Sequence, residues 1–164
     1  MSFSVRKVHP DSIIPTRHHE GDAGVDLYAL WSVTIHPWSQ GVIDTGIELV
    51  ELPQMDDPQY GGSNVPLCKG WRSVLQIWPK SGLDAKMSLH TGAGIVDYLY
   101  RGEIKVLVKN QSDRIVEIRK GDAIAQAVVV PCYVGDVVEV TATNETKRGK
   151  SGGITKAYAD RTEE

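Results

Sequence analysis

Short runs in which apolar and polar residues alternate recur along this chain, separated by glycine, proline, asparagine and aspartate. The clearest run places Ile104, Val106 and Val108 on one side of an extended segment. A period of two residues is the signature of a β-strand with one buried face. We therefore expect strands over 4–8, 25–30, 42–45, 47–51, 73–77, 104–108, 114–118, 124–130 and 137–140.

The spacing of these runs predicts an all-β domain, either a sandwich or a barrel. One short helix is expected over 81–87, with Ser81 as its N-cap and Asp84 near the positive end of the helix dipole. The segment 52–70 loses periodicity and gathers prolines and glycines, which is typical of a long loop. From residue 147 the chain is polar and contains several glycines, so we expect a β domain over 1–146 followed by a flexible arm over 147–164.

Charge and composition narrow the partners of the chain. Its 164 residues carry a net charge of −3, and the 18 Lys and Arg residues are scattered, so duplex nucleic acid is not an expected partner. No apolar run reaches the roughly 18 residues of a membrane span, and the N-terminus lacks a signal-peptide pattern. We expect a soluble, cytoplasmic or otherwise intracellular protein without a membrane partner. Cys68 and Cys132 lie far apart, so we expect reduced thiols and no zinc site.

The segment 91–103, TGAGIVDYLYRGE, combines two glycines with a carboxylate, Asp97, and an aromatic residue, Tyr100. Gly92 and Gly94 have no Cβ, so a flat base can approach the backbone of such a hairpin closely. The backbone N–H and C=O groups would then read the donors and acceptors of the base. On this segment alone, an ordinary glycine-containing turn with a solvated aspartate is the alternative interpretation.

The same segment resembles the third motif of the dUTPase family, G-A-G-V-I-D-x-D-Y-R-G-E. This resemblance implies that Asp97 orients and activates the attacking water, while Tyr100 packs on the deoxyribose and disfavours a ribose 2′-hydroxyl. Leu99 stands where the family usually has a second Asp, which removes a charge beside the site. The resemblance implies three further substrate-binding residues in this segment: Thr91, Gly94 and Ile95.

Two other segments resemble the first and second motifs of the family. Residues 23–29, AGVDLYA, resemble A-G-x-D-L-x-A, whose carboxylate, here Asp26, lies toward the triphosphate and, through water, toward the metal. Residues 79–83, PKSGL, resemble P-R-S-S/G-L, a phosphate-binding motif. Lysine in place of arginine keeps the positive charge but gives up a bidentate fork. The phosphate contacts implied here are those of Lys80, Ser81 and Gly82.

The fourth and fifth motifs of the family have weaker counterparts. Residues 121–126, GDAIAQ, resemble G-D-R-I-A-Q, which implies a phosphate contact from Gln126; Ala123 replaces the usual arginine, and Arg119 and Lys120 are the neighbouring cations. Residues 148–157 resemble in part R-G-x-G-G-F-G-S-T-G, a mobile tail that closes over the active site of a neighbouring subunit. The contacts implied by this tail are those of Arg148, Gly153 and Ile154. Ile154 occupies the place of a base-stacking Phe, and Tyr158 is the candidate replacement; a flexible polar end is the alternative.

Together these motifs imply a distorted jelly-roll-like β-barrel and a homotrimer whose subunits exchange their tails and share active sites. The implied reaction is hydrolysis of dUTP to dUMP and pyrophosphate by attack of water on the α-phosphorus, with Mg²⁺ held mainly by the triphosphate. Two alternatives stay open. A catalytically weakened nucleotide-binding regulator would account for Lys80, Ala123 and Ile154, whereas a dCTP deaminase would lack its catalytic Glu, because Leu107 occupies the aligned position.

Overall fold

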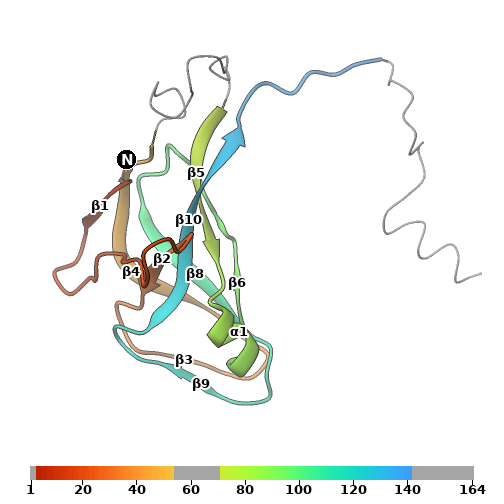
Figure 1. Cartoon of the computed structure of the whole chain (residues 1–164). Helices are drawn as coiled ribbons and strands as arrows, with labels where there is room; N and C mark the ends of the chain where they lie inside the picture. The colour runs from red at the N-terminus through yellow and green to blue at the C-terminus, as the bar shows by residue number, and fades with distance from the viewer. Residues whose placement is uncertain (1–2, 54–70, 142–164) are drawn as a thin grey trace, which may run out of the picture.

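The computed structural model describes residues 3–53 and 71–141 (Figure 1). Its elements in chain order are β1 (Ser4–Lys7), β2 (Val25–Tyr28), β3 (Val33–Ile35), β4 (Gln40–Glu51), β5 (Trp71–Trp78), α1 (Ser81–Met87), β6 (Leu89–Gly92), β7 (Ile95–Val96), β8 (Glu103–Asn110), β9 (Val116–Ile118) and β10 (Ala123–Tyr133). Most of the expected loop over 52–70 and the whole arm over 147–164 lie outside the described residues, and so do Cys68, Arg148, Gly153, Ile154 and Tyr158.

The strands pair in antiparallel ladders that form three sheets. Two have four strands, in the orders β1-β4-β8-β6 and β2-β10-β5-β7, and the third joins β3 to β9. The predicted all-β class is confirmed. The described strands form open sheets rather than a closed barrel. No helix in residues 3–53 and 71–141 is long and apolar enough to cross a membrane.

The core lies between the two large sheets, and both sheets contribute to it. Its fully buried side chains include Leu27, Ile43, Leu49, Leu75, Ile104 and Ile124. Burial of each such side chain contributes about 1.5–3 kcal/mol to folding. The alternation predicted over 104–108 is confirmed in β8, where Ile104, Val106 and Val108 are buried and Lys105 is exposed.

Helix α1 was predicted with correct bounds and the wrong N-cap. Ser81 is the first helical residue, and the extended residue before it, Lys80, is the N-cap, without a side-chain capping bond. The carbonyl of Lys80 accepts hydrogen bonds from the N–H groups of Leu83 and Asp84, so the first turn closes one residue earlier than expected. Asp84 lies in the first turn, as predicted.

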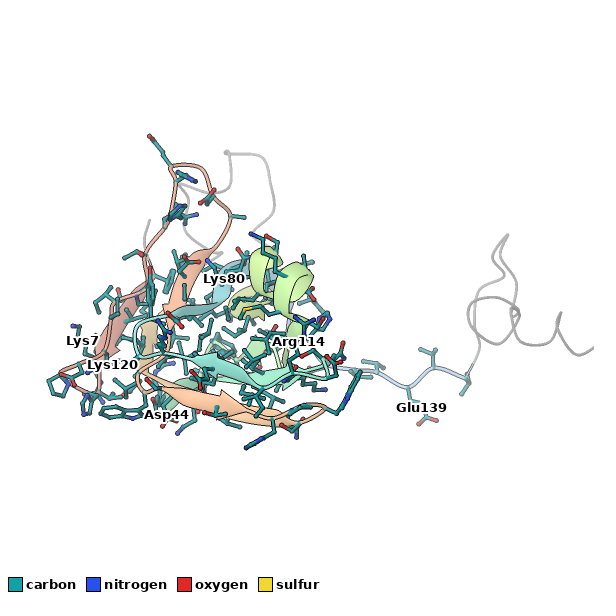
Figure 2. All side chains as sticks on the ribbon, turned by 90° about the horizontal axis from the view of Figure 1, so that it is seen from below. Lys7, Asp44, Lys80, Arg114, Lys120 and Glu139 are labelled. Atoms are coloured by element: carbon teal, nitrogen blue, oxygen red, sulfur yellow. The ribbon has the colours of Figure 1, made fainter. Side chains whose placement is uncertain are left out.

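Other differences from the predicted strands follow from tertiary contacts. The two strands expected over 42–45 and 47–51 are one strand, β4, interrupted by an irregularity at Gly46. The strand expected over 137–140 is wrong: this segment has no strand structure, and Val137 and Val138 are 100% and 75% exposed. Figure 2 shows Glu139 far from the sheets, where no described strand is available for pairing.

Candidate active site

The residues expected to bind phosphate converge where β2, β10 and the start of α1 meet, and Figure 2 shows Lys80 beside α1. Asp26 on β2 lies directly opposite Gln126 on β10. Lys80 Nζ donates a 2.5 Å hydrogen bond to Asp26 Oδ1, and the two side chains are 30% and 14% exposed. Gln126 Nε2 donates to the carbonyl of Pro79 at 3.1 Å. The structure therefore brings together one residue from each of the segments that resemble the first, second and fourth motifs.

Two glycines at this site have different neighbours. A Cβ at Gly24 would lie 2.9 Å from Gln126 Oε1, so the close packing of the Gln126 side chain requires glycine there. A Cβ at Gly82 would meet no atom within 4 Å. The backbone beside Lys80 and Ser81 therefore faces open space, which leaves room for a ligand.

The segment 91–103 is not the simple hairpin that was predicted, because it crosses between the two large sheets. Gly92 ends β6, which pairs with β8, whereas β7 pairs with β5 in the other sheet. The carbonyl of Gly94 accepts a 2.7 Å hydrogen bond from the N–H of Ile77, and a Cβ at Gly94 would lie 2.8 Å from the carbonyl oxygen of Ile77. The chain's own strand β5 therefore occupies the close approach that was expected for a base at this glycine.

Asp97 and Tyr100 lie on the turn that leads from β7 to β8. The side chain of Asp97 is exposed, and its carbonyl accepts a hydrogen bond from the N–H of Tyr100 at 3.0 Å. The hydroxyl of Tyr100 donates to the carbonyl of Glu103 at 3.1 Å, and the side chain remains 45% exposed. A Cβ at Gly102 would lie 2.5 Å from the Tyr100 hydroxyl oxygen, so glycine lets the ring lie against the backbone.

The turn with Asp97 lies far from the phosphate-binding residues of the same chain. Val96 is paired with Leu75 in the middle of β5, whereas Lys80 lies two residues beyond Trp78, the end of that strand. At about 3.3 Å per strand residue, this separation along β5 amounts to roughly 15 Å. In Figure 1 the turn before β8 and helix α1 lie at opposite ends of β5. One chain, as far as it is described, does not place Asp97 beside Lys80.

The segment that resembles the fourth motif, residues 121–126, begins in a turn that is held by its own hydrogen bonds. Asp122 Oδ2 accepts a hydrogen bond from the N–H of Arg119 at 2.8 Å, and Gly121 has a φ of 86°, in the left-handed region. Lys120 donates to Asp11 at 2.7 Å, and this hydrogen bond together with the lysine charge lowers the pKa of Asp11. Lys120 is therefore bonded to Asp11 and not to Gln126. It does not take the place of the arginine that the family motif has at position 123.

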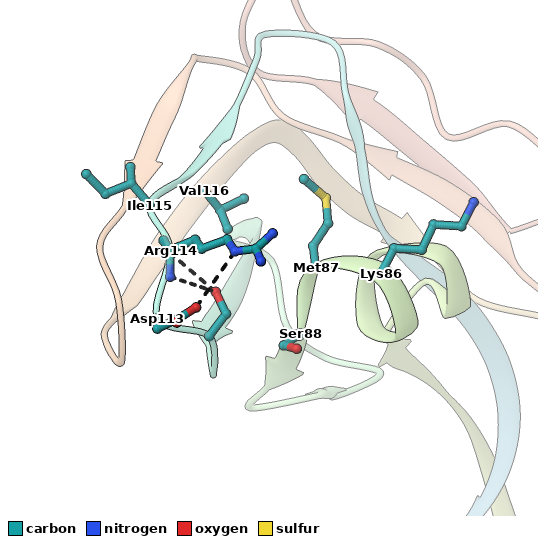
Figure 3. A pocket seen from close by; sticks show the side chains of 8 residues that line it. Lys86, Met87, Ser88, Asp113, Arg114, Ile115 and Val116 are labelled. Carbon is teal, nitrogen blue, oxygen red and sulfur yellow. Dashed lines mark hydrogen bonds and ion pairs between the residues drawn. The ribbon is translucent and has the colours of Figure 1, made fainter.

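Two described cavities lie away from the phosphate-binding residues. A cavity of about 390 Å³ separates the end of α1 from the loop before β9 (Figure 3), and its lining includes Lys86, Met87, Arg114 and Ile115. A smaller cavity of about 120 Å³ lies behind the Asp97 turn, and its lining includes Arg72, Tyr98 and Arg101. Neither contains the residues that the motifs implicate in phosphate binding, which lie on an open surface of this chain.

The described residues offer no cage for a metal ion. Within 3–53 and 71–141, no group of three His, Cys, Asp or Glu side chains lies close enough to hold a cation. Asp26 is the acidic side chain at the phosphate-binding residues, and its Oδ1 atom accepts a hydrogen bond from Lys80. This donor set fits Mg²⁺ only if other ligands, such as phosphate oxygens and water, complete its coordination.

The pairing of Lys80 with Asp26 was not predicted from the sequence. The sequence analysis assigned Lys80 to phosphate and Asp26 to the metal. Their opposite charges were the one feature of the sequence that could have indicated an ion pair. Glu103 was also given no role, because its main contact, Gly46, lies 57 positions away in the chain. No local pattern connects these two residues.

Comparisons with known proteins agree with these motifs. The dUTPase family model matches residues 70–155. The deoxyuridine 5′-triphosphate nucleotidohydrolase of Picosynechococcus sp. is 37% identical over 154 residues, which cover 93% of this chain and 96% of that protein. The structure of the dUTPase of Staphylococcus bacteriophage 80alpha with dUpNHpp matches with a TM-score of 0.75 at 22% identity, covering 93% of this chain and 96% of that one.

A second solved structure has a similar fold. The dUTPase of phage phi11 of S. aureus, described with a structural Mg(II) ion, matches with a TM-score of 0.71 at 21% identity and covers 88% of this chain and 100% of that one. The family match covers more than half of the chain, and the cyanobacterial enzyme is similar over nearly all of it. The chain belongs to the dUTPase family.

Proposed function

We propose that this protein hydrolyses dUTP to dUMP and pyrophosphate. The observation that carries the proposal is the convergence of Lys80, Asp26 and Gln126 on a surface that is open at Gly82. Its similarity over 93% of its length to a protein named deoxyuridine 5′-triphosphate nucleotidohydrolase supports dUTP as the substrate. No other nucleoside triphosphate is favoured by any contact in the described residues.

The triphosphate is bound by Lys80, Ser81, Gly82 and Gln126 in this proposal. Lys80 is paired with Asp26 before the substrate arrives. An incoming phosphate competes for the ammonium group, because phosphate oxygens carry more negative charge than a carboxylate and accept strong charge-assisted hydrogen bonds. Lys80 then either contacts the Asp26 carboxylate and the phosphate together or turns away from Asp26 toward the phosphate. The second outcome leaves Asp26 available to the metal.

Mg²⁺ is the proposed cofactor, and Asp26 is the described residue that would hold it, through water. When bound, the cation neutralises charge on the phosphate chain. The fit rests on the donor set, since one part-buried carboxylate beside a lysine suits a cation coordinated mostly by phosphate and water. A related dUTPase from phage phi11 is described with a structural Mg(II) ion.

Tyr100 and Asp97 supply the sugar and water contacts in this proposal. The exposed face of the Tyr100 ring packs on the deoxyribose and leaves no space for a 2′-hydroxyl. Asp97 positions the water that attacks the α-phosphorus in line with the leaving pyrophosphate. A carboxylate is a weak base, so positioning of the water contributes more to the rate than proton abstraction. Thr91 and Ile95 are the proposed base contacts, because β5 occupies the close approach to Gly94.

A homotrimer with shared active sites is the second part of the proposal. The separation of roughly 15 Å between Lys80 and the Asp97 turn along β5 supports it, because one water cannot contact both sets within a single chain. A neighbouring subunit would bring its Asp97 turn to the phosphate-binding residues, and Arg148, Gly153 and Ile154 of a tail would close the site. Sedimentation should give three times the mass of the chain. A fully active monomer would contradict this arrangement.

The activity is tested with a panel of substrates. The protein is incubated with dUTP, dCTP, dTTP and UTP, with Mg²⁺ and with a chelator, while pyrophosphate and ammonia are measured. We expect pyrophosphate from dUTP only, and only with Mg²⁺. Tight dUTP binding without pyrophosphate would instead favour the nucleotide-binding regulator. Ammonia from dCTP would favour the deaminase, although Leu107, on β8, supplies no acid for that reaction.

The role of Asp97 is tested with Asp97→Asn. This variant should bind dUTP nearly as well as the parent protein and lose turnover, because the amide keeps the shape of the carboxylate but not its charge. Asp113→Asn is the matched control, since Asp113 is an exposed carboxylate with 83% of its side chain accessible in a different loop. Full activity of Asp97→Asn would remove Asp97 from the mechanism.

A further inference from the structure

The side chain of Glu103 connects the Tyr100 turn to a distant part of the β4 strand. Glu103 Oε1 accepts a 2.7 Å hydrogen bond from the N–H of Gly46, and its other oxygen lies 3.2 Å from Lys105 Nζ. The carbonyl of the same residue accepts the hydroxyl of Tyr100. One residue therefore contacts both the body of the sheet and the aromatic side chain proposed to meet the sugar.

The Gly46 end of this connection is rigid. From Asp44 to Glu48 β4 advances four residues while β8 advances two, from Lys105 to Glu103, so β4 bulges. Gly46 has a φ of 65°, and a Cβ there would collide with the hydroxyl of Ser12. The bulge is held from several directions, so it can act as a fixed point for Glu103. The bonds that hold it come from the Thr45 hydroxyl to the Ile104 carbonyl, and from the Val8 N–H and the Ser12 hydroxyl to the Gly46 carbonyl.

Lys105 fixes the direction of the Glu103 carboxylate. Its ammonium group lies 2.6 Å from Asp44 Oδ1 as well as 3.2 Å from Glu103 Oε2. Hydrogen bonds to Asp44 and Glu103 raise the pKa of Lys105, so this group stays charged at neutral pH. The Glu103 side chain is only 21% exposed, and water therefore competes weakly for its hydrogen bond to Gly46.

The backbone of the Tyr100 turn is held by Arg101, whose Nη1 donates to the carbonyls of Tyr98 and Tyr100 at 3.0 and 2.8 Å, but these bonds do not hold the Tyr100 ring. The turn around it exposes the side chains of Asp97 and Leu99, and Leu99 is 65% exposed. Within the described residues, the hydroxyl of Tyr100 bonds to the Glu103 carbonyl and its ring lies against Gly102. The orientation of the ring therefore depends on where Glu103 is held.

We propose that Glu103 is a positioning residue that sets the Tyr100 ring and thereby the preference for deoxyribose over ribose. This inference rests on the proposed hydrolysis of dUTP. Glu103 does not touch the substrate: it holds the carbonyl that receives the Tyr100 hydroxyl at a fixed place relative to the β4 bulge. A ring that is free to tilt makes room for a 2′-hydroxyl, so loss of Glu103 affects selectivity more than it affects binding of dUTP.

The test compares Glu103→Leu and Glu103→Gln with a matched control, Glu48→Leu. Glu48 is the Cα partner of Glu103 on β4, and its carboxylate bonds to Arg6 at 2.7 Å. The measured quantity is the ratio of kcat/KM for dUTP to that for UTP. Glu103→Leu should lower this ratio about tenfold, which is the scale of one lost charge-assisted hydrogen bond. Glutamine still offers an oxygen to the Gly46 N–H but loses the ion pair with Lys105, so Glu103→Gln should lower the ratio by a smaller factor than Glu103→Leu, whereas Glu48→Leu should keep the ratio.

A purely structural role would give a different result. In that case Glu103→Leu and Glu48→Leu would lower the melting temperature and total activity without changing the dUTP to UTP ratio, which would overturn the inference. If Glu103→Leu does not fold, Lys105→Met is the milder variant, because it releases the carboxylate but keeps its bond to Gly46. Lys105→Met should lower the ratio in the same direction by a smaller factor, and an unchanged ratio would overturn the inference as well.

Amide hydrogen exchange separates this inference from the proposed function, because it needs no turnover. In Glu103→Leu, the amides of 44–48 and 97–103 should both exchange faster than in the parent protein, whereas Glu48→Leu should leave 97–103 unchanged. If the parent protein does not hydrolyse dUTP, the proposed function fails, and the exchange data still decide whether Glu103 couples the two segments. Unchanged exchange over 97–103 in Glu103→Leu would overturn the coupling even in an active enzyme.

Discussion

Replacing Lys80 by methionine removes the ammonium group of the proposed phosphate site and keeps an unbranched side chain of similar length. Lys80 Nζ lies 2.5 Å from Asp26 Oδ1, and the two side chains are 30% and 14% exposed, so water screens this pair only in part. A hydrogen bond to a charged group contributes about 1.5–3 kcal/mol, so loss of the contact to phosphate should lower kcat/KM for dUTP about 10- to 150-fold.

A second effect comes from Asp26, which the substitution leaves without its cation. Two unit negative charges about 5 Å apart repel each other by about 3 kcal/mol at an effective dielectric constant of about 20. The carboxylate would then oppose the triphosphate in Lys80→Met. Asp26→Asn removes that charge together with the proposed water-mediated metal contact, so the double variant should recover part of the activity that Lys80→Met loses when Mg²⁺ is in excess. The two substitutions are therefore expected to be non-additive.

The assay measures steady-state pyrophosphate release from dUTP by the parent protein, both single variants and the double variant. Lys86→Met is the matched control, because Lys86 lies in the last turn of the same helix and lines the separate cavity shown in Figure 3. Its kcat/KM should stay within about twofold of the parent value. A value for Lys80→Met within threefold of the parent protein, or an equal loss in Lys86→Met, would show that Lys80 does not bind the phosphates.

Three further predictions concern stability. The Asn110 side chain is only 1% exposed and donates to the carbonyls of residues 35, 36 and 114. Asn110→Leu leaves these carbonyls buried without a donor, so a denaturant titration should show a free energy of unfolding lower by about 3–5 kcal/mol. Gly94→Ala should lower the melting temperature and separate β7 from β5, since its Cβ would lie 2.8 Å from the Ile77 carbonyl; unchanged melting would contradict this. The pKa of Asp11 is lowered from 3.8 by the Lys120 hydrogen bond, so the stabilisation is present above pH 3.8 and lost as the pH falls through the folded-state value. The melting temperatures of the parent protein and Asp11→Asn should differ at neutral pH and converge in acid.

Strands with one buried face and long ladders were predictable from the sequence. In β8 the alternation places Ile104 and Val106 in the core, and no tertiary contact is needed to recognise it. The short strands β3, β6 and β7 were not predicted, whereas β1, β2 and β9, which are equally short, lie within the longer runs expected as strands over 4–8, 25–30 and 114–118. The strand expected over 137–140 has the composition of a strand, but hydrogen-bonded partners decide whether such a segment pairs, and no described strand lies beside it.

The bulge in β4 shows a second limit of the sequence pattern. Two runs with strand character, 42–45 and 47–51, are separated by Gly46, and a glycine between such runs fits a turn as well as a bulge. The contacts that decide for a bulge come from distant segments: Ser12 bonds to the carbonyl of Gly46 and Glu103 to its N–H. A long strand with a fixed irregularity is therefore a property of the folded chain.

The motifs identify the proposed site residues, but their arrangement depends on β5. Strand β5 pairs with both β10 and β7, so it places Gln126 and Lys80 near one end and the Asp97 turn toward the other. A chain built this way has a phosphate half and a sugar half that face different surroundings. Because hydrolysis needs the water on Asp97 to reach the phosphorus held near Lys80, the activity proposed here requires association of subunits.

The departures from the family motifs at Lys80 and Ala123 fall on the phosphate half, whereas Tyr100 and its support from Glu103 lie on the sugar half. Under this proposal the phosphate contacts and the sugar contacts come from different subunits at each shared site, and Asp97 belongs to the sugar half. Substitutions at Lys80 and at Glu103 should therefore change phosphate binding and sugar selectivity independently.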